Sequence, residues 1–136
     1  MSALPVPTEH DEQVALFRWA ALNEWHEPRL ELLYAIPNGG ARHPAVAGKL
    51  KAEGVKPGVP DVCLPVAAGG YQGLYLELKR VRGGSVQAAQ ARWNRMLIRE
   101  GYRAVVARGW VAAAQAICEH LDRADMAPDE AKGGVR

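Results

Sequence analysis

Apolar and polar residues alternate along residues 74–79, which read LYLELK, as they do in a β-strand with two unlike faces. The alternation puts Tyr75, Glu77 and Lys79 on one face of the strand and three leucines on the other. Because leucines on one face pack readily into a core, the pattern predicts a strand whose opposite face carries a carboxylate and an amine.

A second apolar run, residues 62–64, precedes this strand, and a glycine-rich link, residues 67–70, lies between the two. The link is short enough to fold the two runs back on each other as a β-hairpin. In that hairpin Asp61, just before the first run, lies near Glu77 on the second strand. The pattern therefore predicts that two carboxylates converge at one end of the hairpin.

Elsewhere the hydrophobic period becomes that of a helix, and turn-forming residues divide the chain into further elements. Thr8 and Ser85 are typical N-cap residues, Pro44 suits a first helical turn and Gly54 suits a helix end. The pattern predicts helices over residues 8–24, 44–53, 85–100 and 110–121, and strands over residues 32–36 and 102–107.

The first predicted helix carries an apolar stripe at helical spacing, Val14, Phe17, Ala21 and Trp25, which we expect to face the core. Glu12 lies off that stripe, and a carboxylate near the start of a helix also stabilises the helix dipole. The helix over residues 85–100 is expected to have an apolar side formed by Ala89, Trp93, Met96 and Leu97.

One compact domain fits a length of 136 residues and a hydrophobic content of 49%. We expect an α/β domain over residues 1–124, with a mixed central sheet flanked by helices, and a flexible tail over residues 125–136. Neither a long apolar run nor a signal peptide is evident, so we expect a cytoplasmic protein. Cys63 and Cys118 are expected to be buried free thiols, and the histidine spacing predicts no structural zinc.

The net charge is only +2, but it is distributed unevenly along the chain. Residues 1–41 carry a net charge of −4, residues 42–108 carry +8 and residues 109–136 carry −2. Since phosphate contacts dominate nucleic-acid binding, the basic middle segment indicates a nucleic acid as a partner. A solvated helix face explains some of the same arginines, and this alternative stays open.

Asp61, Glu77 and Lys79 form a combination suited to phosphodiester hydrolysis. Hard carboxylate oxygens hold Mg²⁺ or Mn²⁺ and leave positions open for water and phosphate, while the amine orients or deprotonates the water. Each fragment also has a plain structural explanation, because Glu-x-Lys is a common solvated pair in strands and Pro-Asp is a common turn opener. The local pattern alone leaves both explanations open.

The order of these residues resembles the VRR-NUC family of the PD-(D/E)xK nuclease superfamily, in the standalone form known from phages and bacteria. The likeness runs from about residue 9 to about residue 121 and is carried by Glu12, then Gly58-x-Pro60-Asp61, then Glu77-x-Lys79, then Gln90-x-x-Trp93. The resemblance implies a restriction-endonuclease-like core with a mixed β-sheet, and the activity of a divalent-metal-dependent DNA endonuclease.

The resemblance also implies a set of metal ligands. We expect Asp61, Glu77 and the backbone carbonyl of Leu78 to hold Mg²⁺ or Mn²⁺. Glu12, on the first helix, would support a second ion or a bound water, and Glu9 is the alternative carboxylate on that helix.

Further site residues follow from the same resemblance or from the basic charge of the middle segment. Lys79 would position the attacking water and Gln90 would lie near the site, although an ordinary exposed helix residue is the competing interpretation of Gln90. Standalone members carry a Pro-Asn-Gly segment similar to residues 37–39, for which a plain turn is the alternative. The candidate DNA contacts are Asn38, Gly39, Arg42, Lys49, Lys56, Arg80, Arg82 and Arg92.

The DNA structure that would be cleaved is left open by the sequence. Standalone members resemble junction resolvases, so a four-way junction is the first candidate, with flap cleavage and duplex nicking as alternatives. A C₂ homodimer would address two scissile phosphates, and we expect Trp19, Leu22, Trp25 and residues 34–36 at its interface, unless these tryptophans complete a monomer core. The rival functions are a non-catalytic DNA-binding module with the same fold and an interaction protein with alanine-rich docking helices.

Overall fold

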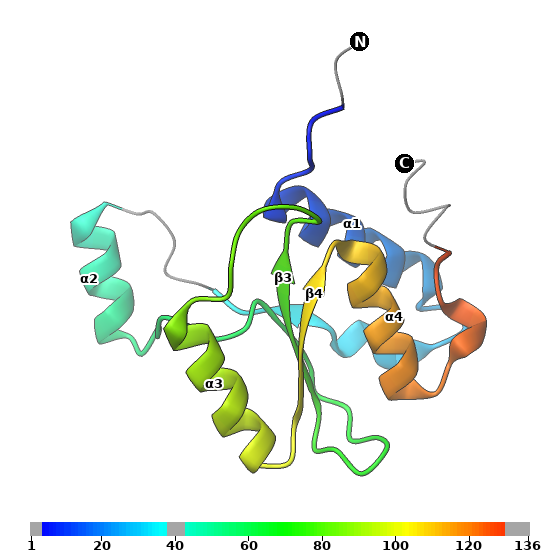
Figure 1. Ribbon diagram of the computed structural model, residues 1–136. Helices are drawn as coiled ribbons and strands as arrows, with labels where there is room; N and C mark the ends of the chain where they lie inside the picture. Colours follow the sequence, from blue (N-terminus) through cyan, green and yellow to red (C-terminus); the bar gives the residue numbers. More distant parts are fainter. Residues whose placement is uncertain (1–3, 38–42, 130–136) are drawn as a thin grey trace.

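The computed structural model describes residues 4–37 and 43–129. Within these residues the chain forms four α-helices and a mixed four-stranded β-sheet (Figure 1), which confirms the predicted α/β class. The helices are α1 (Glu9–Asn23), α2 (Pro44–Ala52), α3 (Ala88–Arg99) and α4 (Trp110–Leu121). The strands are β1 (Tyr34–Ala35), β2 (Val62–Leu64), β3 (Leu74–Lys79) and β4 (Arg103–Arg108). Two short 3-10 helices, η1 (Pro28–Leu32) and η2 (Ala124–Met126), follow α1 and α4.

The strands lie in the order β1-β2-β3-β4. β1 pairs antiparallel with β2 and β2 pairs antiparallel with β3, whereas β3 and β4 are parallel. The predicted hairpin is confirmed, because Val62 lies opposite Leu76 and Leu64 lies opposite Leu74. Parallel neighbours need a crossover connection, and α3 supplies it between β3 and β4.

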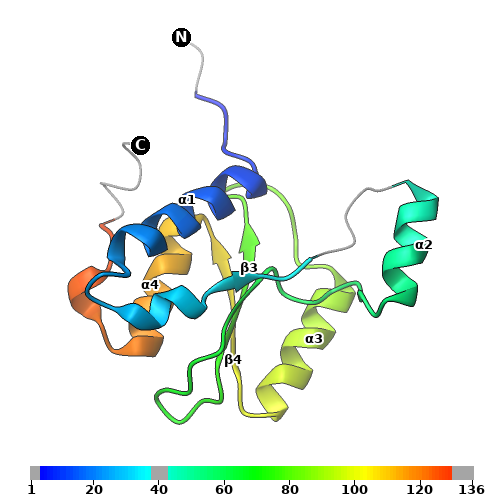
Figure 2. The same cartoon turned by 180° about the vertical axis from the view of Figure 1, so that it is seen from behind.

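Helices cover both faces of the sheet. α1 and α4 pack against each other and against β3, whereas α3 lies on the other side of the strands (Figures 1 and 2). Leu74, Leu76 and Leu78 of β3 join the core that contains Leu16 of α1 and Ile117 of α4. The polar side chains of β3 therefore face α3. In contrast, α2 stands away from the sheet and has no buried residue.

The predicted core stripe of the first helix is wrong except at Phe17, which is partly buried and packs against the core. α1 buries Leu16, Trp19 and Ala20, whereas Val14 is 41% exposed and Trp25 is 81% exposed. The helix offers two apolar stripes at helical spacing, and close packing against the alanine-rich α4 selects the stripe with Leu16 and Ala20. Periodicity alone could not identify that partner.

Three further predictions differ from the structure in detail. Leu32 ends the 3-10 helix η1 and is 50% exposed, so the first strand is shorter than predicted. The N-cap of α3 is Gln87 and not Ser85, because the Gln87 backbone N–H donates a hydrogen bond to the side chain of Gln90 in the first turn. Within α3 only Leu97 is buried, and Met96 is 49% exposed. The apolar side of α3 is therefore largely available at the surface.

The packed part of the chain continues past residue 124, where we expected the domain to end. Met126 is 6% exposed and belongs to the core. The side chain of Gln115 in α4 donates a hydrogen bond to the carbonyl of Pro128. Apolar contact and hydrogen bonding thus hold the start of the predicted tail on the domain.

Both cysteines, Cys63 and Cys118, are buried free thiols, as predicted. Burial raises the pKa of each thiol, which keeps both protonated and unreactive at neutral pH. Among residues 4–37 and 43–129, no helix has the length and apolar character needed to cross a bilayer.

Candidate active site

The hairpin register brings Asp61 and Glu77 together. Val62 pairs with Leu76, so Asp61 stands opposite Glu77, one step beyond the last pair of the ladder. The Oδ2 atom of Asp61 accepts the backbone N–H of Leu78 at 2.8 Å. This bond replaces a ladder hydrogen bond where β2 has ended, and it holds the Asp61 carboxylate against β3.

The segment before Asp61 is held in place by α3. Gly58 has a φ of +88°, and a Cβ atom at this position would lie 2.7 Å from the backbone C and O atoms of Ala89. Only glycine permits both the positive φ and the close approach. The position of Asp61 therefore depends on the contact between this segment and the first turn of α3.

Glu77 is a buried carboxylate with an incomplete set of hydrogen bonds. Its side chain is 3% exposed, and Oε1 accepts the Gln90 side-chain N–H at 2.7 Å. Among the described residues no donor reaches Oε2, which is also buried. The pKa of Glu77 is raised to about 8, mainly because the carboxyl is buried. The negative charge of Asp61 also raises this pKa, by more than the Lys79 ammonium lowers it.

Lys79 and Gln90 join Asp61 and Glu77 in one group between β3 and α3, which we call the polar cluster. The Lys79 side chain is 7% exposed, and its Nζ donates to Gln90 Oε1 at 3.1 Å. Nζ also lies 3.7 Å from Glu77 Oε1 and 3.8 Å from Glu9 Oε1. Gln90 Oε1 additionally accepts the Gln87 N–H, so the amide is fixed with its oxygen toward the amine and its nitrogen toward Glu77. A single glutamine thus links both polar groups of the Glu-x-Lys triplet.

Glu12 is fully buried and contacts the start of α4. Its Oε1 accepts the backbone N–H of Trp110 at 3.2 Å, where a carboxylate also stabilises the helix dipole. The adjacent Gly109 donates its N–H to the carbonyl of Lys79 at 2.9 Å. Within the described residues, no three His, Cys, Asp or Glu side chains gather as metal ligands do. The metal-supporting role of Glu12 therefore stays a prediction.

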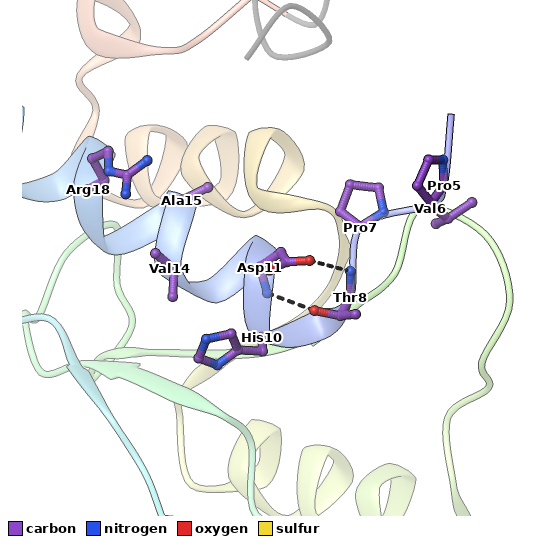
Figure 3. A pocket seen from close by; sticks show the side chains of 9 residues that line it. All are labelled: Pro5, Val6, Pro7, Thr8, His10, Asp11, Val14, Ala15 and Arg18. Atoms are coloured by element: carbon purple, nitrogen blue, oxygen red, sulfur yellow. Dashed lines mark hydrogen bonds between the residues drawn. The ribbon is translucent and has the colours of Figure 1, made fainter. Parts of the chain in front are cut away.

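Arg80 holds the N-terminal segment beside the site. Its Nε and Nη2 atoms donate to the carbonyls of Pro7 and Val6 at 3.3 and 3.2 Å. That segment leads into α1, where the Thr8 hydroxyl accepts the Asp11 N–H and the Asp11 carboxylate accepts the Thr8 N–H (Figure 3). This reciprocal cap fixes the first turn of α1, from which Glu9 reaches the amine.

Sequence reasoning missed Arg108 at the end of β4. Its guanidinium donates to the carbonyl oxygens of Arg80, Gly83 and Gly84 at 3.0, 2.8 and 3.2 Å. These three bonds define the path of the loop that follows Lys79. The only signal in the sequence is an arginine that precedes a glycine at a strand end, which is too common to identify such a role.

The predicted DNA contacts are spread over the α2 and α3 side of the molecule. Lys49 lies on α2, whereas Lys56 and Arg92 line one hollow between the segment after α2 and α3. Arg80 and Arg82 belong to the exposed loop after β3. The predicted contacts Asn38, Gly39 and Arg42 lie outside the described residues.

The residues present fit a divalent cation. Asp61 and Glu77 offer carboxylate oxygens, and the buried Glu77 Oε2 lacks a donor among the described residues. The N–H and C=O groups of one strand residue point to the same side, and successive residues alternate between the two sides. The Lys79 carbonyl is bonded on the β4 side, so the Leu78 carbonyl points to the opposite side, toward Asp61, which the Leu78 N–H binds. Three hard oxygen groups therefore face one region, which is the donor set that Mg²⁺ or Mn²⁺ prefers.

Comparison with known proteins identifies the family. The family model described as "VRR-NUC domain" matches residues 8–110. A solved structure described as "VRR_NUC domain protein" is 29% identical, superposes with a TM-score of 0.75, and covers 88% of this chain and 92% of its own. No curated protein matches the chain. The family match spans most of the chain and contains all the residues of the polar cluster, so the chain belongs to the VRR-NUC family and is a nuclease-type domain that acts on DNA.

Proposed function

We propose that this chain is a divalent-metal-dependent DNA endonuclease that hydrolyses phosphodiester bonds. The observation that carries the proposal is the buried Glu77 carboxylate, whose pKa is about 8 and whose Oε2 has no donor among the described residues. An ionised Glu77 would be costly in the free protein, but a cation held between Glu77 and Asp61 would offset that cost. The arrangement of Asp61 and Glu77 is therefore suited to binding a metal ion.

Asp61, Glu77 and the carbonyl of Leu78 would hold Mg²⁺ or Mn²⁺. When bound, such an ion supplies positive charge to the phosphate and makes water a better nucleophile at neutral pH. The protein fixes these ligands in advance, because the Leu78 N–H holds Asp61 and the Gln90 amide holds Glu77. Such preorganisation leaves little reorganisation for the reaction itself.

Lys79 and Gln90 would position the nucleophile. Nζ of Lys79 donates to Gln90 Oε1, so the direction of the amine is set, and its other N–H groups would contact water or a phosphate oxygen. In hydrolysis the water oxygen bonds to phosphorus, one P–O ester bond breaks, and a proton from water ends on the departing hydroxyl. Lys79 would orient that water for in-line attack.

The two carboxylates of α1 would have different roles. Glu9 Oε1 is 3.8 Å from Lys79 Nζ, so Glu9 would help to orient the amine or a nearby water. Glu12 accepts the Trp110 N–H, next to the Gly109 N–H that binds the Lys79 carbonyl. Glu12 would therefore act on the site mainly by fixing the end of β3, while support of a second ion remains its alternative role.

DNA would approach across the basic loop after β3 and the surface between α2 and α3. Arg80 and Arg82 lie on that loop, directly after the polar cluster. Lys49, Lys56 and Arg92 would contact phosphates further along the backbone, and Asn38, Gly39 and Arg42 are proposed contacts from the segment outside the described residues.

We also propose a C₂ homodimer that acts on branched DNA, with a four-way junction as the first substrate. Leu22, Trp25 and Tyr34 are 69%, 81% and 49% exposed, and such large apolar side chains favour an interface. Trp19 belongs to the core and drops out of the predicted interface. The mass of the protein at micromolar concentration, measured by light scattering, tests this point, since a monomer would remove the paired incision.

The deciding assay is cleavage of plasmid and branched DNA in Mg²⁺, Mn²⁺ or EDTA. We expect strand breaks with either ion, none in EDTA, and none with Asp61→Asn, whose fold should survive. Equal cleavage by the wild type in EDTA and in Mg²⁺ would exclude the metal mechanism. Intact DNA under all conditions, together with retained DNA binding, would favour the non-catalytic DNA-binding module.

A further inference from the structure

A groove adjoins the polar cluster between the segment after α2 and the start of α3. One hollow of about 260 Å³ is lined by Lys56, Pro57, Ala89, Arg92 and Trp93. A second hollow of about 380 Å³ shares Lys56 and Trp93 and extends toward Ile36 and Val55. We refer to these two hollows together as the Trp93 groove.

The lining of the Trp93 groove combines an aromatic ring with positive charge. Trp93 is partly buried and lines both hollows. Lys56 and Arg92 are exposed cations beside it, and Glu53 is the acidic residue among the described lining of the second hollow. An aromatic face next to cations complements a nucleotide, because the base stacks on the ring while the phosphate contacts the charges.

The Trp93 groove lies next to the proposed catalytic residues. Gln90 and Trp93 are three positions apart on α3 and so share one side of the helix. Gln90 binds both Glu77 and Lys79. Ala89 lines the groove and also contacts the glycine of the segment that carries Asp61. A strand bound in the groove would therefore continue to the reacting phosphate within a short distance.

We propose that the Trp93 groove binds one unpaired nucleotide of the DNA strand beside the scissile phosphate, with its base on Trp93 and its phosphate on Lys56 and Arg92. The relation to a scissile phosphate rests on the proposed nuclease function, whereas the binding of an unpaired nucleotide does not. A base inside a duplex keeps both faces covered by its neighbours, and exposing one face costs stacking energy. The groove thus favours DNA with unpaired nucleotides over fully paired DNA.

Binding in EDTA tests the proposal without cleavage. Fluorescence anisotropy compares the full chain on a blunt duplex, on the same duplex with a single-stranded 5′ or 3′ tail, and on a fully paired four-way junction. Trp93→Leu should weaken binding of one tailed duplex by about 5- to 150-fold and leave the blunt duplex unchanged. Trp93→Phe should retain most of the preference, and Met96→Ala, an exposed apolar change on the same helix, should retain all of it.

Equal losses on tailed and blunt DNA, or equal losses for Trp93→Phe and Trp93→Leu, would overturn the stacking role. If circular dichroism shows that Trp93→Leu is unfolded, 2-aminopurine in the tail of DNA bound to the wild type gives the answer. Its fluorescence should be quenched at one tail position, and unchanged fluorescence at every position overturns the proposal.

A final comparison separates this inference from the nuclease proposal. Absence of cleavage in Mg²⁺ and Mn²⁺ would contradict the nuclease proposal alone, since tail binding is measured in EDTA. A wild type that cleaves DNA but shows no preference for tailed over blunt duplexes would contradict the proposal for the Trp93 groove alone. Lys56→Gln and Arg92→Gln should each reduce the salt dependence of tail binding by about 0.7 in the log–log slope, and an unchanged slope would remove their phosphate contacts from the proposal.

Discussion

Replacing Glu77 by Gln should stabilise the metal-free protein while it abolishes cleavage. Glu77 is 3% exposed, and its pKa rises from 4.5 to about 8 on folding. Folding at pH 7 therefore requires the carboxylate to be protonated, which costs about 3 kcal/mol at 1.36 kcal/mol for each pKa unit. Gln is uncharged and nearly the same shape, and its oxygen can still accept the Gln90 N–H.

The expected gain in the free energy of unfolding at pH 7 is about 1–3 kcal/mol, because the amide avoids this cost and imperfect packing of the new side chain offsets part of the benefit. Because the pKa of Glu77 is higher in the folded than in the unfolded protein, its contribution to the free energy of unfolding is fully present below pH 4.5 and is lost as the pH rises through about 8. The advantage of Glu77→Gln should therefore be small at pH 4.5, grow between pH 4.5 and 8, and stay constant above that range.

Thermal unfolding in EDTA at several pH values measures this difference. Each kcal/mol corresponds to roughly 3–4 °C in Tm for a domain of this size. Adding Mg²⁺ should then stabilise the wild type, by about 2.7 kcal/mol at a hundredfold excess over Kd, and should leave Glu77→Gln unchanged. A wild type that is as stable as the variant in EDTA at pH 8, or a variant that responds equally to Mg²⁺, would refute the reasoning.

Three other changes test separate parts of the structure. Lys79→Ala should lose cleavage with little change in DNA affinity, and a parallel fall in affinity would make the lysine an electrostatic anchor instead. Gly58→Ala should lower stability by about 1–3 kcal/mol and impair cleavage, because of its positive φ and its contact with Ala89, whereas Gly48→Ala, with no atom within 4 Å, should do neither. Burial lowers the pKa of His120, so the free energy of unfolding should fall as the pH drops below about 6.5. His120→Gln should remove this pH dependence of the unfolding free energy measured by chemical denaturation, and an unchanged pH dependence would contradict the prediction.

Local pattern predicted the hairpin well because both strands have a strong signal. The leucine face of β3 and the glycine-rich link left one plausible register, and that register alone sets Asp61 opposite Glu77. The boundaries of α4 were also clear, because its start follows a glycine and its alanines repeat at helical spacing. In both cases the deciding information lies within a short stretch of the chain.

Features that depend on partners distant in the sequence were not predictable. The buried side of α1 is chosen by α4, and the bond from Trp110 N–H to Glu12 joins residues 98 positions apart. The loop contacts of Arg108 likewise require the parallel pairing of β3 and β4 to exist first. Strand alternation pointed to Lys79 and the resemblance pointed to Gln90, but only the fold shows that the Gln90 amide joins Lys79 to Glu77.

The absence of buried residues in α2 has an evolutionary consequence. Surface substitutions usually change stability by no more than about 0.5 kcal/mol, so the sequence of α2 can vary with little risk to folding. If Lys49 of α2 contacts DNA as proposed, variation in that helix would alter which DNA is bound while β3 and α3 keep the proposed catalytic groups in register. Under the proposed function, the part of the domain that carries the chemistry is constrained by its packing, whereas the sequence of α2 is free to diverge.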